Sequence, residues 1–341
     1  MKVIYASTEH GVQRAVSDIL DAFDWKKLLP PKEDILVKIN LTWDYIRPGV
    51  DTSPWVVEAF ARKVKDHVGR IYLGESSQIL VDATRAYAVT RMKDVAEREG
   101  LIWHNFSDNR WIPREVGDLS FSIPEICTKM PVVSIPVVKT HYRSVISVAM
   151  KHLYGCLDDN RHNYHYRLAD YVVAVNSLIP VILTLADGTV SLEGNGPKPG
   201  IPKQTDFLAA STDRIALDYS VAEVMGIAPL SVETTVSGNG VTGSYERIEN
   251  ICIPPLSQRP SFSFRKAAPN FVAKIEKTIR GSREQTAPGI DSPFLGIMKM
   301  GAKRWYNLAY YLLGQYREAK HFMDSNMYGP QWKGHSEGEK R

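Results

Sequence analysis

The stretch from residue 131 to residue 157, PVVSIPVVKTHYRSVISVAMKHLYGCL, decides the fold class of this chain. Its apolar run from Val132 to Val138 is typical of a strand that is buried on both faces, as in the parallel sheets of α/β proteins. Lys139, Thr140 and His141 follow the run directly. We therefore expect them at the carboxyl end of that strand, where open α/β sheets present their ligand-binding loops.

A second basic pair, Lys151 and His152, falls on a helix that the pattern predicts from about Val145 to Leu153. Two lysines and two histidines thus lie within fourteen residues. Each residue taken alone has a plainer interpretation, a solvated lysine or a structural histidine. The cluster as a whole indicates a functional site.

The rest of the chain repeats the pattern of short apolar runs separated by helical periodicity. Strand, helix, strand, helix and strand within the first 75 residues predict parallel pairing with right-handed crossovers. We therefore predict an α/β fold, a mostly parallel sheet flanked by helices, over residues 1–230. Residues 231–341 are predicted to form an irregular, mainly helical extension, with an edge strand at 247–254, a basic helix at 269–281 and an amphipathic aromatic helix at 294–323.

The predicted bounds of the core elements follow from these patterns. The strands are expected at residues 1–7, 34–40, 70–74, 132–138, 181–185 and 207–210, and the helices at 9–23, 55–68, 82–100, 145–153, 170–178 and 213–224, the last with Ser211 or Thr212 as its cap.

Charge and cysteine content exclude several classes of protein. Residues 260–341 hold 14 Lys and Arg against 7 Asp and Glu, whereas the rest of the chain is slightly acidic. A basic tail of this kind fits an acidic partner or a subunit contact better than a nucleic-acid groove. The three cysteines have no CxxC spacing, which argues against a zinc ribbon or an iron–sulfur cluster bound by this chain alone. With no signal peptide and no long apolar run, we expect a cytoplasmic protein without an integral membrane segment.

Polar residues follow the other predicted strands at the same edge of the sheet. Several of them suit an anionic small molecule, because they combine cations, a few carboxylates and glycine backbone that a ligand can approach closely. The candidate binding residues are Lys38, Asn40, Asp44, Arg47, Thr52, Asp187, Glu193, Gly194 and Gly196. The plainer interpretation of Thr52 is a helix cap before Pro54.

The candidate catalytic residues are Lys139, His141, Lys151 and Glu75, as groups able to move a proton or neutralise developing charge. His162 and His165 form an HxxH in a loop-like segment, and they are candidate metal ligands or part of an anion lid. Neither the GxGxxG dinucleotide turn nor the GxxxxGK[ST] phosphate loop occurs in the chain. Residues alone leave the cofactor unknown.

In sequence order these elements resemble the large family known as domain of unknown function 362, over about Ile35 to Gly226. The resemblance rests on an ordered set of short motifs: Lys38-x-Asn40, Thr52-x-Pro54, Gly74-Glu75-Ser76, Pro136-x-x-Lys139-Thr140-His141, Met150-Lys151 to Gly155, Asp187-Gly188, Glu193 to Gly200, and Asp213 with Asp218. Many members carry a ferredoxin-like cluster domain, which this chain lacks. It also has His152 where the familiar pattern has asparagine.

Together these residues predict an enzyme that acts on a carboxylate- or phosphate-bearing small molecule by lysine and histidine acid–base chemistry, in an isomerisation, elimination or group transfer. Two alternatives remain: a metal or iron–sulfur accessory protein, and a redox protein with a bound organic cofactor. The loop Asp44-x-x-Arg47-Pro48 also looks like that of lactate racemases with a nickel-pincer nucleotide, which would imply a related activity. The aromatic carboxyl-terminal helix predicts a homodimer contact or, alternatively, a membrane-surface contact.

Overall fold

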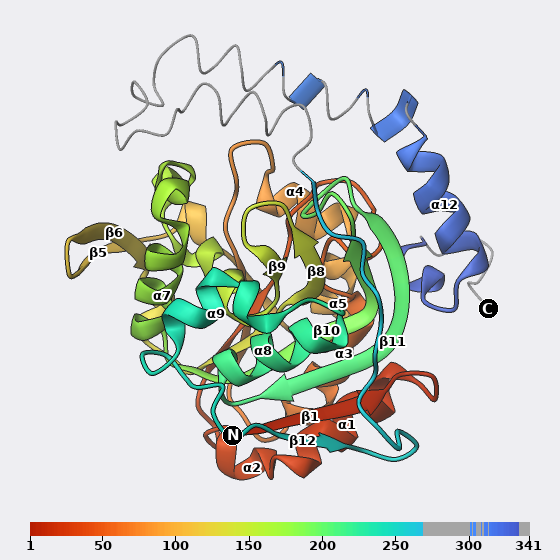
Figure 1. Cartoon of the computed structure of the whole chain (residues 1–341), viewed down its shortest axis with the longest axis horizontal. Helices are drawn as coiled ribbons and strands as arrows, with labels where there is room; N and C mark the ends of the chain where they lie inside the picture. The colour runs from red at the N-terminus through yellow and green to blue at the C-terminus, as the bar shows by residue number, and fades with distance from the viewer. Residues whose placement is uncertain (269–300, 302, 305–307, 309, 313, 334–341) are drawn as a thin grey trace.

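The computed structural model describes residues 1–268, 301, 303–304, 308, 310–312 and 314–333 (Figure 1). One mixed sheet of ten strands forms the centre of this part of the chain. Its main path runs β12 (Glu249–Cys252), β1 (Lys2–Ser7), β11 (Ile201–Ser211), β10 (Val181–Glu193), β7 (Val132–Ile135), β2 (Ile35–Ile39), β3 (Ile71–Glu75) and β4 (Ile102–Asn105). β8 (Val137–His141) also pairs with β10, and β9 (Val145–Ser147) pairs with β8.

Most neighbouring strands are parallel, which confirms the predicted α/β class. β7, β2, β3 and β4 are parallel to one another, and β10 is parallel to β7 and β8. Antiparallel pairing occurs where β11 joins β1 and β10, and where β9 joins β8.

Two layers of helices cover the sheet, and the alternation of side chains along each strand explains why. Leu36 and Val37 are neighbours on β2, yet they belong to different hydrophobic cores on opposite faces. One core packs under helices α1 (Val12–Ala22), α3 (Pro54–Val64), α4 (Ala83–Val89) and α5 (Met92–Glu99). The other face packs under α6 (Ala149–His152), α7 (Leu168–Leu178) and α8 (Arg214–Val224).

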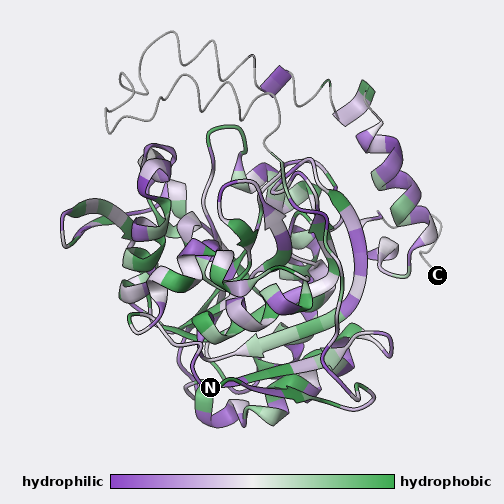
Figure 2. Cartoon of the chain, in the orientation of Figure 1, coloured by the Kyte–Doolittle hydropathy of each residue, from purple (hydrophilic) through white to green (hydrophobic). Residues whose placement is uncertain are grey.

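Several further elements lie in the described part of the chain. They are α2 (Trp25–Leu28), α9 (Glu233–Gly238), α12 (Gln315–Ser325), the hairpin β5 (Trp111–Val116) and β6 (Leu119–Pro124), and the 3-10 turns at Phe106–Asp108, Glu125–Thr128, Leu153–Cys156, Asp159–Arg167, Pro229–Ser231 and Gly329–Trp332. Figure 2 shows β1 largely in the green of hydrophobic residues and α12 largely in purple. None of the helices described is both long enough and apolar enough to cross a bilayer.

The run from Val132 to Val138 is two strands, not the single strand predicted. Pro136 has no N–H to donate, and the chain passes there from β7 to β8. β8 continues to His141, so Lys139 and Thr140 lie inside a strand and not after it.

The helix predicted from Val145 to Leu153 is also wrong in its first part. Residues Val145–Ser147 form β9, and the helix begins only at Ala149. The carboxylate of Asp218 accepts hydrogen bonds from the backbone N–H groups of Ala149 at 2.6 Å and Met150 at 3.2 Å. Because that acceptor comes from α8, far along the chain, the start of α6 could not be read from local sequence.

The predicted parallel partnership of the first two strands is wrong as well. β1 lies away from β2, with β11 on one side and β12 on the other. The long hairpin of β10 and β11 explains the difference, because its strands extend well beyond the predicted 181–185 and 207–210 and lie between β1 and β7. Asp187 is therefore in mid-strand and not at a strand end.

The carboxyl-terminal predictions are tested only where the structure describes the chain. The edge strand expected at 247–254 is confirmed as β12. The helix predicted at 269–281 lies outside the described residues, as does much of the one predicted at 294–323, whose described part includes α12. The division at residue 230 remains a prediction, although β12 beyond that boundary pairs with β1.

Asp213 caps α8, where the sequence favoured Ser211 or Thr212. Its Oδ1 accepts from the backbone N–H of Ala216 at 2.9 Å, and its Oδ2 accepts from that of Ser244 at 2.9 Å. We expect Asp213→Ala to lower the free energy of unfolding by about 1–2 kcal/mol, measured by chemical denaturation. Thr212→Ala, one position earlier, is the matched control and should have little effect. Equal losses in the two variants would contradict the assignment.

Candidate functional site

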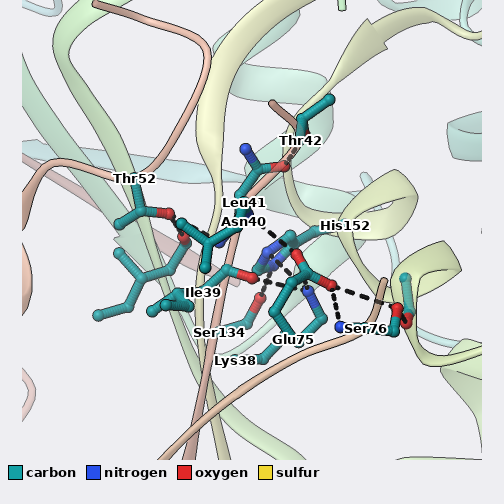
Figure 3. A network of polar contacts seen from close by, with 12 residues as sticks. Lys38, Ile39, Asn40, Leu41, Thr42, Thr52, Glu75, Ser76, Ser134 and His152 are labelled. Atoms are coloured by element: carbon teal, nitrogen blue, oxygen red, sulfur yellow. Dashed lines mark hydrogen bonds and ion pairs between the residues drawn. The ribbon is translucent and has the colours of Figure 1, made fainter. Parts of the chain in front are cut away.

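A buried ion pair between Lys38 and Glu75 joins the ends of two adjacent parallel strands (Figure 3). Lys38 Nζ lies 2.9 Å from Glu75 Oε2, and the two side chains are 1% and 5% exposed. The ammonium also donates to Ile39 O at 2.7 Å. The carboxylate accepts from the backbone N–H groups of Leu41 at 3.0 Å and Ser76 at 2.8 Å. Both charges are thus compensated within the protein, as burial requires.

His152 lies against this ion pair from α6. Its Nε2 is 3.4 Å from Lys38 Nζ, and its Nδ1 is 2.7 Å from Ser134 Oγ (Figure 3). An ammonium group can only donate, so Nε2 accepts and the proton is on Nδ1, which donates to Ser134. Burial lowers the pKa of His152 well below its usual value, and the charge of Lys38 acts in the same direction. The imidazole is therefore neutral, and Ser134 is not activated as a nucleophile.

Lys139 is the second buried lysine, 1% exposed, on β8. Its ammonium donates to three neutral oxygens, Asn40 Oδ1 at 3.2 Å, Thr42 Oγ1 at 3.2 Å and Val50 O at 2.9 Å. Among the residues described it forms no ion pair. Burial lowers the pKa of Lys139 to about 8, and Asp51 acts in the opposite direction. The protonated form of Lys139 is thus less favoured than that of an exposed lysine.

Asp51 lies beside these acceptors with one oxygen satisfied and one not. Its Oδ1 accepts from the backbone N–H groups of Thr42 at 2.5 Å and Trp43 at 3.1 Å. Its Oδ2 is buried and has no hydrogen-bond partner among the described residues. Burial raises the pKa of Asp51 to about 7, and Lys139 opposes that rise. An unsatisfied buried acceptor costs about 1–3 kcal/mol, and more when it is charged, so the free oxygen needs an explanation.

The charges of two further lysines, Lys151 and Lys198, interact with that of Lys139, and neither lysine has a hydrogen-bond acceptor in the described part of the chain. Burial lowers the pKa of Lys198 to about 8, while the negative charges of Asp44 and Asp51 act against this shift. Burial also lowers the pKa of Lys151 well below its usual value. Lys151 Nζ lies 3.7 Å from the centre of the Tyr154 ring, which is a cation–π contact. Within the described residues, neither Lys151 nor Lys198 forms an ion pair with a carboxylate.

Lys198 is brought to the site by the glycine-rich tip of the β10–β11 hairpin. Thr140 Oγ1 donates to Gly194 O at 2.9 Å and holds the tip on β8. A Cβ on Gly196 would lie 1.9 Å from Thr140 O, so only glycine permits this approach. Glu193 anchors the other side, since its carboxylate accepts from the backbone N–H of Arg265 at 3.2 Å. Gly196 thus packs the loop against β8, and the backbone N–H groups of Gly194 and Gly196 donate within the protein, to Arg265 O and Gly194 O at 2.8 Å each. A ligand-binding role for these glycines remains a prediction.

His141 is a buried neutral imidazole next to the lysines. Its Nδ1 accepts from the backbone N–H groups of Arg143 at 3.0 Å and Ser144 at 3.3 Å, which places the ring proton on Nε2. Burial lowers the pKa of His141 well below its usual value, and Lys151 adds to the effect. This histidine can act as a hydrogen-bond donor.

Arg47 is occupied by the protein itself. Its Nε donates to Gly200 O at 2.8 Å, its Nη1 donates to Gln315 O at 3.2 Å, and its Nη2 lies 2.7 Å from Glu318 Oε2. These contacts join the hairpin tip to α12. They account for burial of the guanidinium without a ligand.

Thr52 and Asp187 also make internal contacts. Thr52 Oγ1 accepts from the backbone N–H of Asn40 at 2.8 Å and donates to Ile135 O at 2.8 Å, so it joins neighbouring strand ends and does not cap α3. Asp187 Oδ2 accepts from the backbone N–H of Ser53 at 2.8 Å.

His162 and His165 lie in a 3-10 helix, where the sequence indicated a loop. Each Nδ1 lies near a backbone oxygen, at 3.0 Å from Asp159 O and 2.9 Å from His162 O, respectively. Within the described ranges no three His, Cys, Asp or Glu side chains are grouped to hold a metal ion. Their role as ligands remains a prediction.

The structure thus brings Lys38 and Glu75 together at the ends of β2 and β3, and it places Lys139 of β8 against Asn40, which follows β2. The sequence missed the place of Lys198 and the partner role of Ser134. A single lysine in a loop of glycines and prolines was the available signal for Lys198. Asp44, also predicted, is 2% exposed, and its Oδ2 lies 3.4 Å from Arg85 Nε.

Three known proteins are similar to this chain over part or most of its length. A thylakoid-associated protein of Synechocystis sp. is 26% identical over 225 residues, which are 60% of this chain and 66% of that protein. The chain therefore spans slightly less than two thirds of that relative. A crystal structure of a Thermotoga maritima protein matches with 10% identity and a TM-score of 0.34, over 57% of this chain and 53% of that one. A loganic acid methyltransferase with SAH matches with 11% identity and a TM-score of 0.25, over 92% and 88%.

The family model described as domain of unknown function (DUF362) matches residues 35–223, nearly the range over which the sequence motifs were found. That range contains Lys38, Glu75, Lys139, His152 and Lys198. More than half of the chain is covered, and the predicted resemblance is confirmed: the chain belongs to the DUF362 family.

Proposed function

We propose that this protein is an enzyme that binds a small anion, a carboxylate or a phosphate, and moves a proton on it with Lys139. The observation that carries the proposal is a group of three lysines, Lys139, Lys151 and Lys198, that form no ion pair among the described residues. Lys139 is buried, and Lys151 and Lys198 are partly buried. Removing positive charge from water without compensation is unfavourable, and a bound anion would supply the compensation.

The roles within the group follow from their contacts. Lys198 and Lys151 have ammonium protons that the described residues do not accept, so they are the groups to hold the anion. Burial lowers the pKa of Lys139 to about 8, in the direction that suits a proton-transfer group. The Nε2 proton of His141 is a further donor. Glu75, by contrast, is engaged with Lys38 and two backbone N–H groups, which favours a positioning role.

A screen in D2O tests the proposal. Purified protein is incubated with pools of metabolic carboxylates and phosphates, and mass spectrometry detects a deuterium gained at carbon, while thermal unfolding reports binding. We expect at least one anion to raise the unfolding temperature and to gain deuterium. The proposal would be contradicted if none of the anions tested raised the unfolding temperature or gained deuterium.

Two finer expectations belong to the same proposal, and two alternatives to it can be tested on the purified protein. Exposed Tyr311 and Leu312, 55% and 72% accessible, support a homodimer contact, which native mass spectrometry would test. The free state of Cys127, Cys156 and Cys252 supports a reducing, cytoplasmic location. The metal-accessory and cofactor-dependent redox alternatives, including a racemase-like one, would be favoured instead if the purified protein contained stoichiometric metal or a bound chromophore.

A further inference from the structure

The free oxygen of Asp51 indicates what the ligand must carry besides its negative charge. Oδ1 is held by the N–H groups of Thr42 and Trp43, so the carboxylate is fixed in orientation. Oδ2, on a residue only 5% exposed, has no partner among the described residues. An acceptor that is fixed, buried and unused matches a hydrogen-bond donor that arrives with the ligand.

The lysines and Asp51 occupy the same small region. Lys139 donates to Thr42 Oγ1, and the backbone N–H of Thr42 donates to Asp51 Oδ1. Lys139 also donates to the backbone oxygen of Val50, the residue before Asp51. The charge of Lys198 also acts on Asp51. A ligand that exchanges a proton with Lys139 therefore lies close to Asp51.

We infer that the ligand is a small carboxylate or phosphate that carries a hydroxyl group, and that Asp51 Oδ2 accepts a hydrogen bond from this hydroxyl. The inference rests on the proposed function, because it assumes that the lysines bind an anion. A carboxylate repels a second anionic group at this position, and an alkyl group would leave Oδ2 unsatisfied. Asp51 thus acts as the residue that selects hydroxylated anions over their deoxy counterparts.

Matched pairs of probes test the inference. Glycerate is compared with propionate, and glycerol 3-phosphate with propyl phosphate, so that each pair differs only in its hydroxyl groups. Calorimetric titration of the full chain, in buffer above neutrality, should give at least about tenfold tighter binding for the hydroxylated member of one pair. The pair that responds identifies the anion as carboxylate or phosphate.

Asp51→Asn is the informative variant. Asparagine keeps an oxygen for the N–H groups of Thr42 and Trp43, but it places an NH2 donor where Oδ2 was. The ratio of the two affinities within a pair should fall to about one, while loss of the negative charge of Asp51 should strengthen binding of the deoxy probe. Asp66→Asn, with the same charge change on the exposed segment after α3, should leave the preference intact.

Three results would overturn the inference. The first is equal affinity within both pairs, and the second is an unchanged preference in Asp51→Asn. The third is failure of both hydroxylated probes to bind. The proposed function would be overturned only if the D2O screen also found no anion that stabilises the protein or gains deuterium.

Discussion

Replacing Lys139 by methionine is expected to reduce turnover of the anionic substrate by about 10²–10⁴-fold, because the group that exchanges the proton is lost. Methionine keeps most of the volume of the side chain, so the effect reports on the ammonium. The deuterium-incorporation rate of the anion found in the screen measures it, and the ratio of kcat/KM values gives the size of the loss.

Lys139→Arg separates charge from proton transfer. Arginine stays protonated, so it should retain much of the binding but not the turnover. Since burial lowers the pKa of Lys139 to about 8, the wild type should bind the anion more weakly as the pH rises through that value. Lys139→Arg should not show this loss of affinity. Lys65→Met, at a half-exposed ion pair with Glu99, is the control for loss of one positive charge. Full turnover in Lys139→Met would remove Lys139 from the mechanism.

Glu75→Ala is expected to lower the free energy of unfolding by about 3–5 kcal/mol, because Lys38 then remains as a buried cation without its counter-charge. The substitution also removes the acceptor of the backbone N–H groups of Leu41 and Ser76. Denaturant titration measures the effect. It should be among the largest single-site losses in the chain, since most substitutions cost far less.

The double variant Lys38→Met, Glu75→Leu should recover much of that stability, since it removes both buried charges together. Asp18→Ala, which breaks the exposed Arg14–Asp18 pair, should cost much less. A Glu75→Ala loss no larger than that of Asp18→Ala would show that Lys38 is compensated by another route.

The sequence was sufficient where local pattern and burial agree. The run Ile35–Ile39 is entirely buried and forms a central parallel strand, as its apolar residues predicted although Lys38 lies among them. Parallel strands end at one edge of a sheet, and this placed Lys38, Glu75 and Lys139 near one another before any contact was known. Pairwise contacts were out of reach, so the sequence did not predict the ion pair between Lys38 and Glu75.

The failures share a physical cause, which is a partner distant in the chain. α6 begins where Asp218 caps it from 69 residues away. Thr52 was interpreted as a helix cap because Pro54 follows it, but its hydroxyl is used by Asn40 and Ile135. The charges of Lys198 and Asp51 interact because the hairpin tip is held on β8 by Thr140.

The position of β1 has a consequence for synthesis of the protein on the ribosome. This first strand pairs with β11 and β12, so no sheet partner exists until residues near 201 have been made. At about 5–20 residues per second, that interval is roughly 10–40 s. Throughout it the nascent chain carries an apolar strand with both edges unpaired, which is a target for chaperones and for aggregation. We expect yield in a heterologous host to depend on chaperone supply more than the stability of the finished fold would suggest.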